Sequence, residues 1–483
     1  MRAEQPDLAK STREKNDMTE KFTRRRLLAT SAATGAGMLA GGSIPAFAQD
    51  AEADLPVGAS GTLTVIQRQE YFEAAGVLFR DIVQEFADAN NVELDISTTN
   101  AEAFGDFLGK MSAAVRAGNP PDIAYTSNVS IAQMSLLGLL EDVTDVVEEA
   151  ISLYGDLMPG MNAEKFGMVD GKWMAIPFLG SVGAGTFIRG DKLAEAGIDP
   201  ATLTTFDARR DAALAISDPD NEFWGWGLTP NQSGDGYGFL ILLIQAFGGS
   251  LTDESGLKVT FDSPETVAAF EWLAETYDRN GKYAAMLPPG IESWGDISNN
   301  EAYLAGKIGY THNAMSVYAQ ANRDGNPVFP NTIMMTVPQA NNGDSRDGGQ
   351  VGGWLTILKG APNVDLAKKL ALDILNPENF NQMSAQGGGL FMPAFQNMWT
   401  DELLAADPNF AIIKEQLSVP EPFLGISWPA QPNAAIDAIR PPGIVEQAVG
   451  NIIAGRMTPA EAVADAHQKM VDLFEEGGIP QDG

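Results

Sequence analysis

Two histidines, His312 and His467, and no cysteine limit the chemistry open to this 483-residue chain. A serine–histidine–acid triad or a histidine zinc site would have to use one of these histidines, and neither stands in a supporting motif. The lack of cysteine excludes disulfides, thiolate ligands and a cysteine nucleophile. No Walker A pattern occurs, and the glycines of 180–185 lack the order of a dinucleotide fingerprint. The sequence therefore predicts no catalytic residue, metal site or cofactor, and leaves open only a glycosidase-type carboxylate pair.

Side chains suited to holding a ligand follow two predicted strands, at 63–66 and 123–125. Ligand crevices of parallel α/β sheets lie at the carboxyl ends of the strands, so both groups are placed to reach a ligand. Turn and cap roles account for such residues equally well. The candidates are Gln67, Arg68 and Tyr71 after the first strand and Thr126, Ser127 and Asn128 after the third.

The spacing of apolar residues predicts strands that alternate with helices. Ala75, Phe79, Ile82 and Phe86 are four, three and four residues apart, which is the spacing of one buried helix face. Alternating apolar residues over 92–96 predict a second strand, and a helix over 104–115 stops at the Gly-Asn-Pro-Pro of 118–121. This alternation indicates parallel pairing and an α/β fold.

Two later helices carry start signals. Ser263 followed by Pro264 is an N-cap with proline at the first helical position. Thr458 and Glu461 have the spacing of a capping box. We therefore expect helices that begin at 264 and 459.

Residues 23–48 have the pattern of an export signal. Consecutive arginines at 24–26 precede a weakly apolar, glycine-containing run that ends in Ala-Phe-Ala. The pattern predicts a twin-arginine (Tat) signal peptide over 1–48, cleaved between Ala48 and Gln49, and a flexible lead-in over 49–60. We expect a folded, exported protein in the periplasm, without a lipid anchor because there is no cysteine to carry one.

The formal net charge of −33 restricts the partners. Such a field disfavours nucleic acid, anionic membrane surfaces and anionic ligands. An acidic, soluble surface explains it without any specific acidic site. Neutral and cationic ligands stay open.

Seven short motifs, in matching order and spacing, resemble the family 1 extracellular solute-binding proteins of ABC importers, the carbohydrate-binding group that includes the maltose-binding type. The resemblance covers nearly all of the chain after the leader. The motifs lie at 117–123 (AGNPPDI), 138–143 (GLLEDV), 170–177 (DGKWMAIP), 191–200 (DKLAEAGIDP), 248–265 (GG before FDSPE), 305–309 (AGKIG) and 352–357 (GGWLTI).

The resemblance implies a type II periplasmic binding protein, with two α/β lobes, each a sheet flanked by helices, and a ligand cleft between them. The motifs predict lobe one over 61–179 plus 353–395 and lobe two over 180–352 plus 396–483. A ligand that touches both lobes only when they are closed shifts an open ensemble toward the closed form. The resemblance implies a monomer that is not an enzyme and that delivers a neutral sugar, oligosaccharide or polyol to a membrane permease.

A carbohydrate site needs aromatic platforms and fixed hydrogen-bonding groups. Trp354 is the first aromatic candidate, because Gly353 before it lets backbone approach a ligand, and core packing is its alternative role. Within the resemblance, Asp235 and Tyr237 lie in a contact segment just before a helix and are candidates for hydroxyl binding and stacking, and Ser181 lies at a lobe crossing. The remaining candidates are Phe391, Trp294, Asn313 and Tyr318.

A cationic solute such as a polyamine is the alternative ligand, because it suits the negative charge. An exported glycoside-active enzyme is the alternative of a different class. The departures from the family pattern around 312–318 leave the identity of the solute open.

Overall fold

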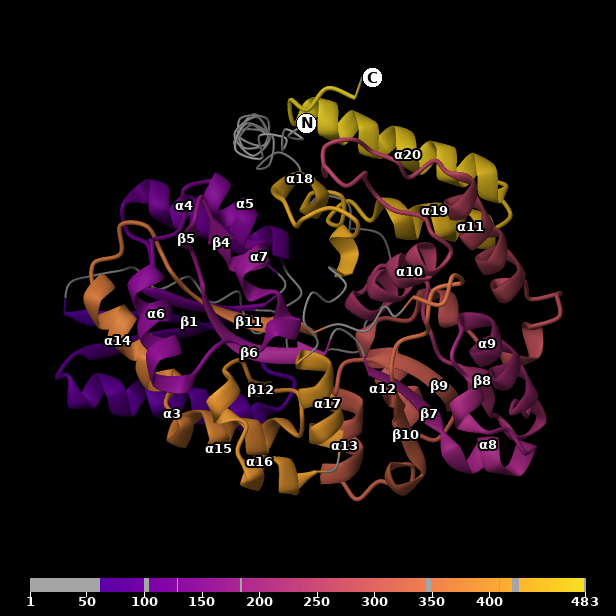
Figure 1. Cartoon of the computed structure of the whole chain (residues 1–483), viewed down its shortest axis with the longest axis horizontal. Coiled ribbons are helices and arrows are strands. Elements are labelled where there is room, and N and C mark those ends of the chain that lie inside the picture. The colour runs from indigo at the N-terminus through magenta and orange to yellow at the C-terminus, as the bar shows by residue number, and fades with distance from the viewer. Residues whose placement is uncertain are drawn as a thin grey trace, which may run out of the picture.

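The structure is a computed structural model that describes residues 61–99, 104–127, 129–182, 185–344, 349–407, 409–418 and 425–481. The predicted signal peptide with its cleavage point at Ala48 and Gln49, the lead-in 49–60 and Asn128 lie outside the described residues. The described chain forms two α/β lobes that lie side by side (Figure 1). The predicted fold class is confirmed.

A six-stranded sheet forms the centre of the first lobe, in the order β12-β6-β11-β3-β1-β2. The predicted parallel pairing is confirmed for β1, β2 and β3, whereas β11 runs antiparallel to both β3 and β6. The strands are β1 (Thr62–Arg68), β2 (Glu93–Thr99), β3 (Ile123–Thr126), β6 (Ile176–Val182), β11 (Gly349–Ile357) and β12 (Met392–Pro393).

Helices from both ends of the chain cover this sheet. On α3, the predicted face is buried at Ala75, Phe79 and Ile82, and the helix packs against α14 and α15 from the far end of the sequence (Figure 1). The helices are α3 (Glu73–Ala89), α4 (Phe104–Ala117), α5 (Ile131–Leu136), α6 (Thr144–Tyr154), α7 (Ala163–Gly167), α14 (Val364–Leu375) and α15 (Pro377–Gly387), with a small hairpin of β4 (Met168–Val169) and β5 (Lys172–Trp173).

The second lobe is built on a four-stranded sheet in the order β10-β7-β9-β8. Alternation along β8 buries Trp226 completely and leaves Trp224 half-buried; the Trp226 indole donates to the Tyr277 hydroxyl at 3.1 Å. The strands are β7 (Gly185–Arg189), β8 (Trp224–Trp226), β9 (Ile308–Asn313) and β10 (Thr332–Met335).

Two helices of the second lobe begin where the sequence predicts, at Pro264 and Pro459. Ser263 caps α11 by accepting from the Thr266 amide, and Thr458 and Glu461 form the capping box of α20. The helices are α8 (Gly190–Ala196), α9 (Phe206–Ala215), α10 (Gly234–Ala246), α11 (Pro264–Tyr277), α12 (Asp296–Leu304), α13 (Ser316–Arg323), α19 (Ile444–Ile453) and α20 (Pro459–Glu476). α10, α11, α19 and α20 pack together (Figure 1).

The chain passes between the sheets from β6 to β7 and from β10 to β11. β6 continues to Val182 and β11 begins at Gly349, so both strands extend past the predicted lobe bounds. Their ends pair with each other and so remain part of the six-stranded sheet. α17 (Asn409–Leu417) lies in the stretch assigned to lobe two but packs against β6 and β11, after α16 (Asp401–Ala406). α18 (Ala434–Asp437) precedes α19. None of the helices in the described residues is long and apolar enough to cross a membrane.

The aspartate of the AGNPPDI motif connects three segments of the first lobe. The fully buried Asp122 carboxylate accepts from the Thr64 amide and hydroxyl, both at 2.9 Å, and from the Asn363 amide at 2.8 Å. These bonds hold β1 and the turn before α14 against the start of β3. The motif residue is therefore a structural support.

Replacing Asp122 with alanine should lower the free energy of unfolding by about 3 kcal/mol, because it leaves several buried donors unpaired around a lost charge. Urea unfolding followed by circular dichroism measures this. Asp81→Ala, an exposed aspartate on α3, is the control and should change stability little. Equal midpoints for the two variants would contradict the support role.

Candidate functional site

The carboxyl edge of the first sheet carries buried polar atoms that lack partners. Gln67 ends the buried part of β1, Thr126 ends β3, its parallel neighbour, and Ser127 follows directly. Within the described residues, Gln67 Oε1, Thr126 Oγ1 and Ser127 Oγ have no hydrogen-bond partner. Each such atom costs about 1–3 kcal/mol when it is kept from water. Hydroxyl groups of a ligand would recover that cost.

A buried ion pair lies beside these atoms. Arg68 donates two bonds to the Glu70 carboxylate, at 3.0 and 2.9 Å, and the Glu70 side chain is only 1% exposed. The guanidinium lies 5.1 Å from the ring centre of Tyr125 and 5.9 Å from that of Phe391. Although burial disfavours the charge, Tyr125 and Glu70 together raise the pKa of Arg68. The pair is therefore fixed and carries no net charge.

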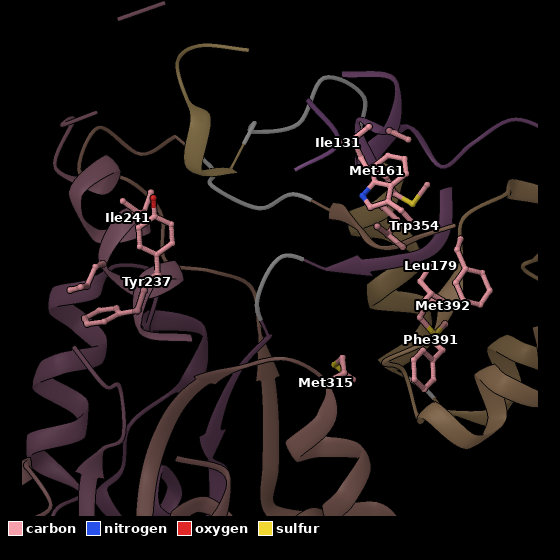
Figure 2. Packing of buried hydrophobic residues seen from close by; sticks show 14 of the residues in the cluster. Ile131, Met161, Leu179, Tyr237, Ile241, Met315, Trp354, Phe391 and Met392 are labelled. Atoms are coloured by element: carbon pink, nitrogen blue, oxygen red, sulfur yellow. The ribbon is translucent and has the colours of Figure 1, made fainter. Parts of the chain in front are cut away.

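Trp354 lies on β11, opposite Thr126 of β3, and is 6% exposed. Its indole fills the space left by Gly167, where an added Cβ would lie 2.6 Å from the ring. Figure 2 shows the side chain beside Ile131 and Met161. At Gly353 an added Cβ would lie 2.8 Å from the Tyr125 ring, so this glycine accommodates a side chain of the protein. The ligand-binding roles of Gly353 and Trp354 stay predictions.

Asparagine and aspartate side chains form the polar centre of the second lobe. Asp235, in the first turn of α10, accepts from the Nδ2 atoms of Asn299 and Asn313, both at 2.9 Å. Asn313 ends β9, and its Oδ1 accepts from the Ser316 hydroxyl at 3.2 Å. Asp296 in turn accepts from the Asp235 amide at 2.9 Å and so caps α10. The bonds hold each amide in one orientation.

This network reaches the first lobe through Asn300. Its Oδ1 accepts from Asn313, and its Nδ2 donates to the Tyr71 hydroxyl at 3.3 Å. Tyr71, just before α3, is 43% exposed, and burial raises the pKa of its hydroxyl. The predicted candidates Tyr71, Asp235 and Asn313 are therefore brought together at the junction of the lobes.

Other predicted residues are placed in packed surroundings. The Tyr318 ring stacks on Phe187, and its hydroxyl lies 3.2 Å from Asp407. Burial and Asp407 raise the pKa of Tyr318 to about 12. Phe391 is fully buried against Gly387. Neither side chain bonds to the Asp235 network.

Of three further predicted residues, Tyr237 is buried, and Trp294 and Ser181 are half-buried. Tyr237 is buried on α10 under the Arg440 guanidinium, 5.2 Å from its ring centre, and in Figure 2 it lies across the view from Trp354. Trp294 is half-buried, and its carbonyl accepts from Thr229 at 2.8 Å. Ser181, also half-buried, pairs with Gln350 along β6.

The sequence interpretation missed Glu70, Asn299 and Asn300. Glu70 stands two residues after Arg68, which is a signal for a local ion pair. The adjacent asparagines 299 and 300 are unusual in a helix interior, where asparagine has a poor propensity. Both are buried polar residues, a feature that only the tertiary structure reveals.

His312 lies on β9, next to Asn313 of the network. Its side chain is buried, and within the described residues neither of its ring nitrogens has a hydrogen-bond partner. Burial, with a smaller effect of Arg209, lowers the pKa of His312 to about 3. No group of three or more metal-binding side chains occurs among the described residues. Binding is the chemistry that hydroxyls, amides and a neutralised ion pair can perform.

Two α/β lobes joined by crossing strands, with polar side chains at their junction, define the class of two-lobe binding proteins. A family model described as bacterial extracellular solute-binding protein matches residues 81–412. The chain belongs to this family of bacterial extracellular solute-binding proteins.

Individual relatives are distant. A maltotriose-binding protein of Pyrococcus abyssi is 25% identical over 191 residues, and the match spans 38% of this chain and 38% of that relative. A mannitol-bound solute-binding protein of Agrobacterium vitis has a TM-score of 0.70 at 19% identity, covering 87% of this chain and 99% of that chain. A tagatose-bound solute-binding protein of Thermotoga lettingae has a TM-score of 0.69 at 19% identity, covering 86% of this chain and 99% of that chain. Maltose-bound MalE3 of T. maritima has a TM-score of 0.69 at 20% identity, covering 84% of this chain and 98% of that chain. These structures share the fold.

His312 should remain neutral from pH 8 to pH 5, because its folded pKa lies near 3 while that of an unfolded histidine is about 6.5. The unfolded chain then binds the proton first, so this residue lowers stability by about 1.4 kcal/mol for each pH unit below about 6.5. Imidazole NMR signals followed through pH should show no titration of His312 in this range. In His312→Gln, the loss of stability between pH 6.5 and 5 should be smaller than in the wild type.

Proposed function

We propose that this chain is the substrate-binding component of an ABC importer, and that it captures a neutral carbohydrate by closing its lobes and delivers it to a membrane permease. The observation that carries the proposal is the network from Asp235 and Asn313 through Asn300 to Tyr71. It joins fixed donors and acceptors of both lobes at their junction. A polyhydroxyl ligand needs such groups from both sides.

The charge at the junction supports a neutral solute. Arg68 is neutralised by Glu70, and the Asp235 carboxylate already accepts from two asparagine amides. The unpaired Gln67, Thr126 and Ser127 atoms are uncharged. The relatives named above are described as binding maltotriose, mannitol, tagatose and maltose, which are sugars or polyols. Membership in the solute-binding family supports the transport role.

The two alternatives are less well supported. A polyamine would need carboxylates free to meet its ammonium groups, whereas Glu70 and Asp235 are both engaged. A glycoside-active enzyme would need a pair of carboxyl groups facing a ligand from opposite sides. The Glu70 and Asp235 carboxylates of this junction instead accept from protein groups.

We extend the proposal to location and to the lobes. The arginines and Ala-Phe-Ala of residues 23–48 support export by the Tat route, cleavage between Ala48 and Gln49, and a location in the periplasm. We also propose that the protein is a monomer. Lobe one is proposed to comprise 61–179 plus 353–395, and lobe two 180–352 plus 396–483, except that the ends of β6 and β11 and the helix α17 pack with lobe one. The proposed ligand-binding residues are Arg68, Tyr71, Thr126, Ser127, Asn128, Ser181, Asp235, Tyr237, Trp294, Asn313, Tyr318, Gly353, Trp354 and Phe391.

A thermal-shift screen of the purified protein against sugars, polyols and polyamines tests the ligand class. We expect stabilisation by members of the neutral group, because a ligand that binds only the folded state raises the melting temperature. Stabilisation by polyamines alone would contradict the carbohydrate proposal.

Asn313→Ala should weaken binding of the sugar found in this screen about tenfold, which corresponds to about 1.4 kcal/mol. The substitution removes the amide that joins Asp235 to Asn300. Isothermal titration calorimetry measures the change. Asn280→Ala, an exposed asparagine in the second lobe, is the control. Equal affinity of Asn313→Ala and the wild type would place the ligand elsewhere.

Trp354→Ala should weaken binding of the same ligand at least about tenfold. It should also lower the free energy of unfolding by about 3 kcal/mol, because the indole fills a packed space over Gly167. Calorimetry and urea unfolding measure the two effects separately. A stability loss with unchanged affinity would assign Trp354 to the core alone.

A further inference from the structure

The short helix α18 is anchored in the second lobe. Its N-cap, Asn433, accepts from the amides of Ala435 and Ile436, both at 3.0 Å, and its Nδ2 donates to the Gly256 carbonyl at 3.3 Å. Gly256 leaves room for this side chain, since an added Cβ would lie 2.4 Å from Asn433 Nδ2. Beyond the helix, Gln232 donates to the Pro441 carbonyl at 3.3 Å. These hydrogen bonds join α18 and the turn after it to residues of the second lobe.

The other side of α18 touches the first lobe. Ser130 Oγ donates to Asp437 Oδ2, and Gln133 Nε2 donates to the Ala434 carbonyl at 3.4 Å. Both donors belong to α5 and its N-cap, which follow β3 and pack against α7 and β4. Figure 1 shows α18 next to α5 and α7, between the two lobes. The contact therefore bridges the lobes through residues that are not part of the Asp235 network.

Charged and aromatic groups surround Asp437 on the side of the second lobe. Arg440 lies over the Tyr237 ring of α10, and Glu446 of α19 is buried nearby with Oε2 lacking a hydrogen-bond partner among the described residues. Burial raises the pKa of Asp437 to about 6, against the opposing effects of Ser130 and Arg440. It also raises the pKa of Glu446 to about 7, again against Arg440. Asp437 is half-buried, and the Ser130 hydroxyl donates to its carboxylate.

We propose that Asp437 and Ser130 form a clasp that holds the two lobes in the closed form. The proposal rests on the binding function proposed above, because closure matters only for a protein that traps a solute. The clasp has one direct member from each lobe, so lobe separation breaks it. Hydrogen bonds to a charged group are worth more than neutral ones, which suits a contact that must compete with water. Asp437 and Ser130 act as positioning residues: they stabilise the closed form without touching the solute.

The absence of cysteine permits a direct test. Leu153→Cys on α6 and Glu271→Cys on α11 place one label on an exposed site of each lobe, and the distance between the labels reports closure without any solute. Pulsed electron spin resonance at pH 8, where Asp437 is ionised, gives the ratio of closed to open forms. Because no ligand is present, the result does not depend on whether the carbohydrate proposal holds.

Ser130→Ala and Asp437→Ala should each lower the closed-to-open ratio at least about fivefold, as expected for loss of a charge-assisted bond. Asp437→Asn, which keeps a neutral acceptor, should have a smaller effect. The double variant Ser130→Ala/Asp437→Ala should be no more open than either single variant, because both remove the same bond. Thr205→Ala, which removes the N-cap hydroxyl of α9, controls for the loss of the cap that Ser130 gives α5.

Unchanged distances in both single variants would overturn the clasp. Strictly additive effects in the double variant would also overturn it, since they would show that the two side chains act independently. Once a ligand is known, the two single variants should release it at least about fivefold faster while Thr205→Ala does not. A failure to bind any sugar, with the distances changed as expected, would contradict only the proposed function.

Discussion

Polar groups that leave water where two lobes meet must be paired across the junction or by a ligand. Asn300 meets this requirement through Tyr71, and Asn313 through Asp235. Gln67 Oε1 and Thr126 Oγ1 do not, within the part of the chain that the structure describes. This constraint explains why the network at the junction is made of amides and hydroxyls and why the Arg68 guanidinium is neutralised by Glu70.

Local features of the fold were predictable from sequence, and its long-range pairing was not. The spacing of Ala75, Phe79 and Ile82 determines one buried helix face, and Ser263 and Thr458 cap helices through bonds within three residues. The antiparallel return of β11 between β3 and β6 depends on partners that lie far apart in the sequence. No local pattern encodes such a choice, and only the family resemblance pointed to two lobes.

The candidate site, like the fold, was predictable from sequence only in its local features. Tyr71, Asp235 and Asn313 were predicted from strand ends and motif positions, and the structure connects them. Asn299 and Asn300 were missed because their burial depends on how α12 packs on β9. Trp354 was singled out for the glycines before it, whereas its surroundings are set by Gly167, almost two hundred residues earlier.

The crossing strands have a consequence for biosynthesis. The six-stranded sheet combines residues 62–68 with residues 392–393, so it is incomplete until most of the polypeptide has left the ribosome. β1, β2, β3 and β6 are synthesised before the four-stranded sheet, and β11 and β12 after it. The edges of the early strands therefore stay unpaired while the four-stranded sheet is translated. Nascent chains are therefore exposed to aggregation for most of their elongation, and a protective chaperone has its greatest effect in that interval.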